Sequence, residues 1–265
     1  MSEKIPGSAD PYTYFAEFYD IGWSAYAEYC RDVVLAAEES AARPFRRVCD
    51  AACGTGVLLE LLRESWSDPD AAGKSSERTL LGFDISAEML QRARERLLPE
   101  DSRMARVQLK MGDLRGSFPF HGPIDLVTCM HDSLNYLQDS DDLLQFFTRV
   151  RWVLAPDGVC ICDINTPKLY RMAAGKAQDY LLNGKQIHET LEYREQENLG
   201  ITRITFPPGT EVHVQRAYTT EEVEELLFRA GLFLSDEIEV EDESARAASG
   251  SSAGSGKVVY VAVKA

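Results

Sequence analysis

Short apolar runs alternate with amphipathic stretches along most of the chain. Residues 124–130 are almost entirely apolar, which is typical of a parallel strand buried on both faces. Residues 141–154 instead repeat apolar side chains at helical spacing. The same patterns predict further strands at 46–50, 79–84, 106–110, 159–165, 232–240 and 258–263, and further helices at 11–40, 57–63, 86–98 and 219–230.

This alternation predicts an α/β fold with a doubly wound, Rossmann-like, seven-stranded sheet and helices on both faces. A loop without a helix separates the last two strands, so the sheet should be mostly parallel with an antiparallel last strand. Three stretches, 186–195, 201–206 and 211–217, alternate apolar and polar residues and predict a small antiparallel β insert. The chain then divides into an N-terminal helical lid (1–43), a Rossmann-like domain (44–166 and 218–265) and the insert (167–217).

Local signals predict where several elements begin and end. Ser86 is a helix N-cap, because its hydroxyl can accept from a free helix N–H. Thr219 and Glu222 have the spacing of a capping box, and Gly231 ends the helix that this box opens. Gly22 should break the N-terminal helix in two. Polar, turn-forming residues predict loops at 65–78 and 244–256.

Composition and charge exclude several classes of protein. The 265 residues carry a formal net charge of −15, and no basic stripe of the kind that binds nucleic acid is present. No apolar run reaches the roughly 18 residues of a membrane span. The N-terminus lacks the order of a signal peptide, and the six cysteines form no C-x-x-C pair. We therefore expect a cytoplasmic protein with buried free thiols, no nucleic-acid or membrane partner, and a monomeric or homodimeric state.

Acidic residues and glycines follow three strands that are consecutive in the chain. Residues 50–56 read Asp-Ala-Ala-Cys-Gly-Thr-Gly, Asp84 ends the second strand, and 112–114 read Gly-Asp-Leu after the third. Open α/β sheets bind ligands at these strand ends, where glycine allows close backbone approach and a carboxylate can accept ribose hydroxyls. Leu59 stands where the dinucleotide fingerprint needs a third glycine, which disfavours an NAD-dependent oxidoreductase.

These motifs resemble the three cofactor motifs of class I S-adenosylmethionine (SAM)-dependent methyltransferases. The resemblance covers roughly residues 12–263, and three more segments (15–20, 131–137 and 213–222) resemble the lid, the segment after strand four and the return from the insert in small-molecule members. The overall plan is similar to the sugar N-methyltransferases of macrolide biosynthesis. The resemblance implies SAM as cofactor, S-adenosylhomocysteine as its product, and transfer to an N or O atom of a small-molecule acceptor.

The resemblance also implies roles for individual residues. SAM would contact Tyr14, Asp50, Ala51, Gly54, Gly56, Asp84, Ile85, Met89, Gly112, Asp113, Leu114, Met130 and His131. The catalytic candidates are His131, Tyr19 and His213, since histidine titrates near neutral pH and a tyrosine can stabilise a sulfonium. The candidates for contact with the acceptor are Tyr19, Trp23, Asn135, Tyr136, Asn165 and Arg216. We expect no metal, because no carboxylate cluster follows strand four. The competing hypothesis is a regulator that binds SAM without transferring methyl.

Overall fold

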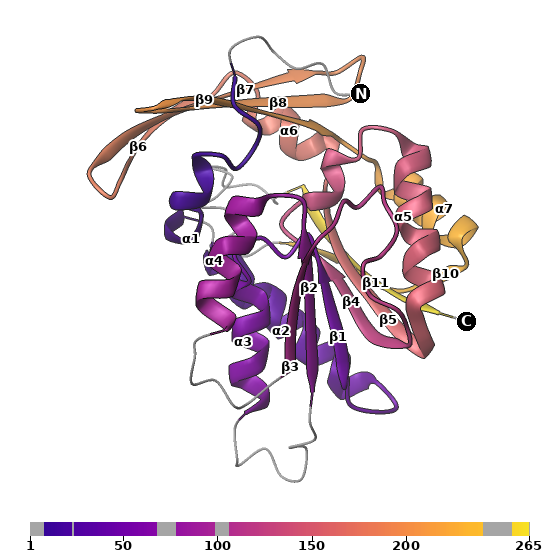
Figure 1. Cartoon of the computed structure of the whole chain (residues 1–265). Helices are drawn as coiled ribbons and strands as arrows, with labels where there is room; N and C mark the ends of the chain where they lie inside the picture. Colours follow the sequence, from indigo (N-terminus) through magenta and orange to yellow (C-terminus); the bar gives the residue numbers. More distant parts are fainter. Residues whose placement is uncertain (1–7, 23, 68–77, 99–105, 241–255, 265) are drawn as a thin grey trace.

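The computed structural model describes residues 8–22, 24–67, 78–98, 106–240 and 256–264. Its central feature is a seven-stranded sheet, whose strands are labelled in Figure 1. Strands β1, β2, β3, β4 and β5 pair in parallel, whereas β11 pairs antiparallel with both β5 and β10. The predicted Rossmann-like fold is confirmed. In sheet order the strands are β10 (Leu232–Glu239), β11 (Lys257–Lys264), β5 (Leu154–Asn165), β4 (Ile124–Cys129), β1 (Arg47–Ala51), β2 (Thr79–Asp84) and β3 (Arg106–Met111).

Two apolar cores cover the two faces of this sheet, because neighbouring strand residues point to opposite sides. Val48 packs with α2, α3 and α4, whereas Cys49 packs with α5 and α7. Cys160 and Cys162 share the second core, and all six cysteines are buried free thiols, as the sequence predicts. Among the described residues, no helix is long and apolar enough to cross a membrane. These helices are α2 (Ser24–Ser40), α3 (Val57–Trp66), α4 (Ala87–Leu97), α5 (Ser140–Val153) and α7 (Thr220–Ala230).

The predicted helix caps are confirmed. The Ser86 hydroxyl accepts from the Met89 N–H at 3.2 Å. Thr219 accepts from the Glu222 N–H, and the Glu222 carboxylate accepts in return from the Thr219 N–H at 2.9 Å. Gly231 ends α7 with φ of +77°, a conformation in which glycine avoids the Cβ clash.

The N-terminal segment, residues 8–22, is not the single helix predicted up to the break at Gly22. It makes turns, a 3-10 helix η1 (Phe15–Glu17) and the short α1 (Tyr19–Gly22) before α2 begins. The buried carboxylate of Glu211 accepts the backbone N–H groups of Tyr12, Tyr14 and Phe15 and attaches this segment to the insert. A bridge between Ala9 and Glu211 continues the same attachment.

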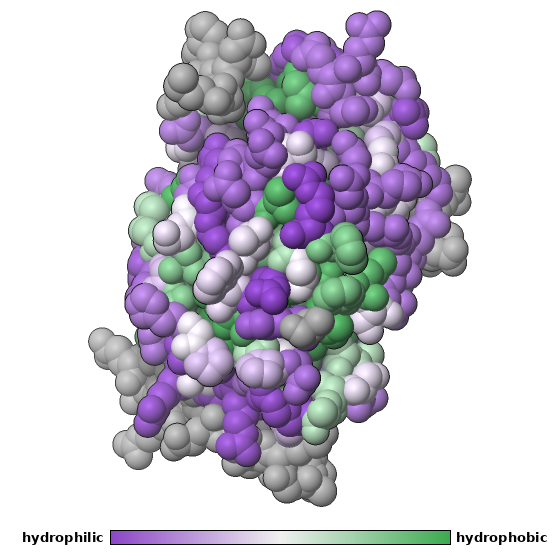
Figure 2. Space-filling view, turned by 90° about the vertical axis from the view of Figure 1, so that its right-hand side faces the viewer, coloured by the Kyte–Doolittle hydropathy of each residue, from purple (hydrophilic) through white to green (hydrophobic). Residues whose placement is uncertain are grey.

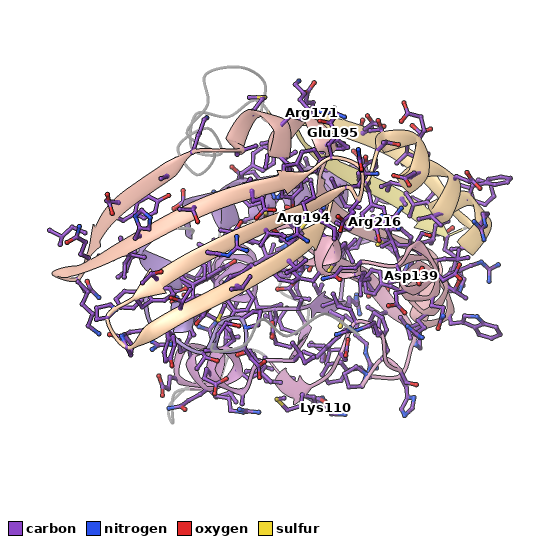
Figure 3. All side chains as sticks on the ribbon, turned by 90° about the horizontal axis from the view of Figure 1, so that it is seen from above. Lys110, Asp139, Arg171, Arg194, Glu195 and Arg216 are labelled. Carbon is purple, nitrogen blue, oxygen red and sulfur yellow. The ribbon has the colours of Figure 1, made fainter. Side chains whose placement is uncertain are left out.

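The insert is a four-stranded antiparallel sheet, one strand more than predicted. It lies across the carboxyl ends of the central strands, as Figure 1 and the view from above in Figure 3 show. Its surface is mostly hydrophilic at the top of Figure 2, whereas apolar patches lie lower on the face that carries α5 and α7. The insert sheet consists of β6 (Ala177–Leu182), β7 (Lys185–Arg194), β8 (Leu199–Phe206) and β9 (Gly209–Arg216), preceded by the unpredicted helix α6 (Pro167–Ala173).

One strand is longer than predicted, and two predicted loops fall mostly outside the described residues. The fifth strand, β5, begins at Leu154 rather than at 159, so it includes Pro156, Asp157 and Gly158. Most of the two predicted loops, namely residues 68–77 and 241–255, lies outside the described residues. The boundaries proposed for lid, Rossmann-like domain and insert stay a prediction.

Candidate active site

Three adjoining cavities lie between the carboxyl ends of the strands, the N-terminal segment and the insert sheet. A long cavity runs past the ends of β2 and β3, and a narrow one lies at the end of β1. The third, the insert cavity, lies beneath the insert sheet. Tyr19 lines all three, and His131 lines both the narrow cavity and the insert cavity. These two candidates therefore mark the place where the cavities meet.

Asp84 faces the long cavity from the end of β2. One carboxylate oxygen accepts from the Gly54 N–H at 2.9 Å and the other from the Ser86 N–H at 2.8 Å. Burial raises the pKa of Asp84, although these backbone hydrogen bonds oppose the shift. Each oxygen keeps a lone pair for a further donor, so the carboxylate can accept from two vicinal hydroxyls.

Apolar side chains and a second carboxylate continue the long cavity. Ile85 is 58% exposed and Met89 lies beside it, while Leu114 lines the cavity from the loop after β3. A Cβ at Gly112 would come within 2.7 Å of the Phe83 ring, so only glycine fits there without a shift. Asp113 accepts from the Arg115 side chain at 3.1 Å. Exposed apolar surface beside carboxylates suits the ring and amino group of an adenine.

Asp50 and Met130 line the narrow cavity. Asp50 accepts a hydrogen bond from the Thr128 hydroxyl at 2.7 Å. Burial raises the pKa of Asp50 from 3.8 to about 7, the Thr128 hydrogen bond opposes this, and nearby Asp84 adds to it. A buried carboxylate with such a pKa gains most from a cationic ligand, because the cation replaces the lost hydration.

His131 follows β4 in an uncommon backbone conformation. Both His131 and Asp132 have positive φ, +58° and +51°. The buried Asp163 carboxylate on β5 accepts the N–H groups of both residues, and Lys257 pairs with Asp132 at 2.9 Å. The His131 ring lies 5.0 Å from the ring of Tyr26. Burial lowers the pKa of His131, so its imidazole is neutral at physiological pH.

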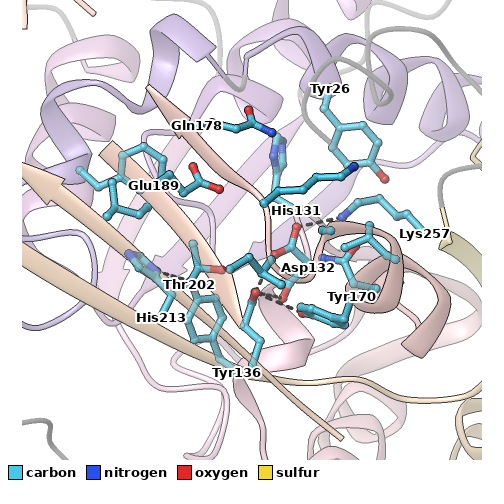
Figure 4. A pocket seen from close by; sticks show the side chains of 18 of the residues that line it. Tyr26, His131, Asp132, Tyr136, Tyr170, Gln178, Glu189, Thr202, His213 and Lys257 are labelled. Atoms are coloured by element: carbon cyan, nitrogen blue, oxygen red, sulfur yellow. Dashed lines mark hydrogen bonds and ion pairs between the residues drawn. The ribbon is translucent and has the colours of Figure 1, made fainter. Parts of the chain in front are cut away.

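The insert cavity takes a row of polar side chains from the insert sheet. Gln178 on β6 and Glu189 on β7 are paired in register, and His213 on β9 is paired with Thr202 on β8. All four line the cavity. Figure 4 shows Glu189, His131 and Lys257 around the same space, although they come from three different parts of the fold. Burial raises the pKa of Glu189.

Three predicted cofactor residues lie elsewhere. Tyr14 lines none of the three cavities and instead packs against Phe206 and Gly209. Ala51 is fully buried in the core beneath the strand end. Gly56 caps α3 with φ of +77°, where a Cβ would come within 2.7 Å of Leu97, so its role is helix packing.

Two predicted acceptor residues have structural roles. Asn135 is fully buried, donates to the Asn165 and Arg216 carbonyls and accepts from the Asn165 N–H. Arg216 pairs with Glu222 at 3.0 Å and its guanidinium lies over the Tyr218 ring, on the side of the insert near Asp139 in Figure 3. Tyr136, Asn165 and His213 do line the insert cavity. Trp23 lies outside the described residues.

Sequence reasoning missed several cavity residues. Tyr12 lines both the long cavity and the insert cavity, and Tyr26 and Lys257 line the latter. Tyr12 and Tyr26 belong to an aromatic-rich stretch that carries no periodic signal for which ring faces a ligand. Lys257 follows a predicted loop, and Glu189 sits in an ordinary alternating strand. Their roles depend on how distant segments pack together, which a local pattern does not contain.

The donor set at the three strand ends fits SAM. Gly54, with φ of +53°, brings backbone to the junction of the long and narrow cavities, and Asp50 and Asp84 flank it. Asp50 suits a cationic amino group, and Asp84 suits a ribose. Within the described ranges, no group of three or more His, Cys, Asp or Glu side chains could hold a metal ion.

Comparison with known proteins agrees with this geometry. Residues 48–158 match the methyltransferase domain family. This match, together with the fold, makes the chain similar to methyltransferases of class I, the class whose methyl donor is SAM.

Several known proteins share part of this sequence or its fold. The putative methyltransferase YqeM of Bacillus subtilis (strain 168) is 28% identical over 206 residues, which are 71% of this chain and 74% of YqeM. The dTDP-4-amino-2,3,4,6-tetradeoxy-D-glucose N,N-dimethyltransferase of Saccharopolyspora spinosa is 30% identical over 114 residues, 43% of this chain and 38% of that protein. A crystal structure of a SAM-dependent methyltransferase from Clostridium acetobutylicum ATCC 824 shares the fold with a TM-score of 0.71 and 24% identity, covering 96% of this chain and 98% of that one.

Proposed function

We propose that the protein transfers a methyl group from SAM to an amine nitrogen of a small polar molecule bound in the insert cavity. The observation that carries the proposal is the junction at Tyr19 and His131. There the cavities with the cofactor donor set adjoin a separate cavity whose lining includes polar side chains such as Glu189 and His213. A regulator that only binds SAM would have no need of this second cavity.

The charges of the insert cavity favour an amine. Glu189 places a carboxylate in the cavity, and burial makes that carboxylate costly to ionise without a cationic partner. Neutral His131 can accept a hydrogen bond from an amine N–H. The relative from Saccharopolyspora spinosa, whose name describes an amino-sugar N,N-dimethyltransferase, supports an amine acceptor.

SAM, when bound, supplies a methyl group already activated on a sulfonium. The protein then has to position the acceptor and keep water out. Asp50 would hold the amino group of the cofactor and Asp84 its ribose, while Ile85 and Leu114 would cover the adenine. His131 holds the acceptor nitrogen in line, since Asp163 fixes its backbone, and Tyr19 encloses the reacting atoms.

The test uses SAM with a deuterated methyl group. We would incubate the protein with this donor and either dTDP-4-amino-2,3,4,6-tetradeoxy-D-glucose or its 4-hydroxyl analogue, and locate the label by fragment masses. We expect label on the amine nitrogen and none on the analogue. Label on a hydroxyl oxygen would contradict an amine acceptor. SAM binding without transfer to these compounds or to a broader metabolite extract would favour the regulator.

A further inference from the structure

Four side chains from distant parts of the chain are joined end to end beside the insert cavity. The Tyr12 hydroxyl lies 3.0 Å from the Tyr136 hydroxyl, which lies 2.7 Å from Nδ1 of His213. Nε2 of His213 lies 3.1 Å from a carboxylate oxygen of Glu211. We propose that these four residues form a proton relay that takes the proton lost by the acceptor amine. The relay rests on the proposed function, because it presumes an acceptor that must lose a proton.

The carboxylate at the far end sets the direction of the relay. Burial opposes ionisation of Glu211, but hydrogen bonds from His213, Tyr14 and Phe15 outweigh it and lower its pKa, so the carboxylate only accepts. Nε2 of His213 must therefore donate to Glu211, which leaves Nδ1 to accept from the Tyr136 hydroxyl. The Tyr136 oxygen in turn accepts from the Tyr12 hydroxyl.

This polarity leaves a free acceptor position on the Tyr12 oxygen. Tyr12 lines both the long cavity and the insert cavity, so its hydroxyl lies at the boundary that the acceptor nitrogen must approach. Burial raises the pKa of both Tyr12 and Tyr136. The two tyrosines therefore pass a proton along as neutral hydroxyls without becoming phenolates.

The proton transfer from the acceptor to His213 needs no further reactant. An ammonium proton of the acceptor bonds to the Tyr12 oxygen as the Tyr12 hydroxyl proton moves to the Tyr136 oxygen. The Tyr136 proton then moves to Nδ1 of His213, which becomes an imidazolium next to Glu211. The electron pair of the broken N–H bond stays on the acceptor nitrogen and becomes its nucleophilic lone pair. The proton leaves to solvent by the reverse path after the product departs.

The same carboxylate couples the relay to the N-terminal segment. Glu211 accepts the backbone N–H groups of Tyr12 at 2.8 Å and Phe15 at 2.9 Å, as well as that of Tyr14. Tyr12 therefore reaches Tyr136 only when this segment is attached to β9. The proton acceptor is complete only when the segment also closes the cavities.

Other ionisable groups face the relay and have to be considered in its pH dependence. Glu189 on β7 interacts with His213, and Asp132 and Asp84 act on Tyr12. These three carboxylates favour a positive charge on the relay. They do not replace it, because no hydrogen bond joins any of them to the four relay side chains among the described residues.

The test compares Tyr136→Phe, which removes the central hydroxyl and keeps the ring, with Tyr193→Phe. Tyr193 is a matched control in the insert sheet whose hydroxyl donates to Asn198 and which lines none of the three cavities. The first readout is the ¹⁵N NMR spectrum of the His213 ring without cofactor or acceptor. We expect the neutral ring to carry its proton on Nε2, and the Nδ1 signal to shift in Tyr136→Phe but not in Tyr193→Phe.

The second readout is single-turnover methyl transfer from SAM to dTDP-4-amino-2,3,4,6-tetradeoxy-D-glucose against pH. Near neutral pH, where the acceptor amine is mostly protonated, we expect Tyr136→Phe to react about 100-fold more slowly than the wild type, a typical contribution of a positioned proton acceptor. The gap should narrow as pH rises, because water then deprotonates the amine. Tyr12→Phe should give the same profile, which keeps the test valid if Tyr136→Phe does not fold.

Two results would overturn the relay: a His213 proton on Nδ1, or a Tyr136→Phe profile that runs parallel to the wild type at every pH, as a merely structural role would give. Failure of the proposed function looks different. In that case the NMR result is as expected, but neither this amine nor any amine in a metabolite extract receives a methyl group. The hydrogen-bonded chain would then stand without its assigned reaction.

Discussion

At the scale of single residues, Asp50 and Asp84 lie at neighbouring strand ends, and in the proposed function each binds a different part of one ligand. Asp50 is buried with a single hydroxyl partner, so its carboxylate favours a cation. Asp84 is held by two backbone N–H groups and keeps lone pairs for neutral hydroxyls. Their positions at strand ends made both residues candidates, because parallel strands bring their carboxyl ends to one edge, and the resemblance to methyltransferases implied their separate roles.

Binding of SAM should release a proton when the pH lies below the pKa of Asp50. Without ligand this pKa is about 7, so the carboxyl is mostly protonated below that pH. The ammonium group of SAM favours the ionised form, so affinity should rise as pH increases toward 7 and level off above it. Calorimetry in buffers of different ionisation enthalpy counts the released protons. The account requires that Asp50→Asn abolish this release; equal release in variant and wild type would contradict it.

Asp84→Asn should weaken SAM binding by about 1–3 kcal/mol, the usual cost of leaving buried hydrogen-bonding groups imperfectly paired. The amide keeps one acceptor oxygen but replaces the other with a donor that faces the hydroxyls or the Gly54 N–H. Isothermal titration measures the change. The exposed Asp157→Asn is the control and should leave the affinity unchanged. If both variants bind alike, the ribose does not lie at Asp84.

Single residues also show the limit of sequence reasoning. The N-terminal aromatics were expected to supply Tyr14 to the cofactor, yet Tyr12 lines the cavity in a segment whose backbone N–H groups are bound by Glu211. Glu211 lies about 200 positions away in the chain. Asn135 was expected to reach the acceptor, but its amide is fully used by backbone groups of two later segments. Both placements depend on long-range contacts that no local pattern encodes.

At the scale of elements, the strands and caps were predictable wherever a local physical cause fixes them. The apolar run of β4 and the caps at Ser86 and Thr219 are examples, because each depends on residues within one element. β6 was missed because its residues are half-exposed or exposed along the whole strand, with no buried position to mark a face. Helix α6 was missed because it is short and packs through Tyr170 against Gly200, which lies in a different element.

The capping box of α7 gives a prediction at this scale. Thr219→Ala removes the hydroxyl that accepts from the Glu222 N–H, so the free energy of unfolding should fall by about 1 kcal/mol. Urea unfolding measures this change. The neighbouring Thr220→Ala serves as control, since Thr220 is inside the helix and does not cap it. A loss of the same size in both variants would show that the cap is not the cause.

At the scale of the whole molecule, the central sheet provides the cofactor site and the insert sheet provides a separate cavity facing it. The N-terminal segment joins the two, since Tyr12 and Tyr19 line cavities on both sides. The sequence predicted the sheet, its antiparallel end and the presence of an insert. It did not predict the interior of the insert cavity, because Gln178, Glu189 and Lys257 converge there only once three distant segments have packed.

The most direct test of the account is a crystal structure of the complex with S-adenosylhomocysteine. We expect the ribose at Asp84, the amino group at Asp50, and the sulfur at the junction of Tyr19 and His131, facing the insert cavity. Such a placement would direct the methyl group of SAM toward the acceptor cavity. A sulfur that faces away from this junction, or a ligand bound outside the long and narrow cavities, would contradict the central claim.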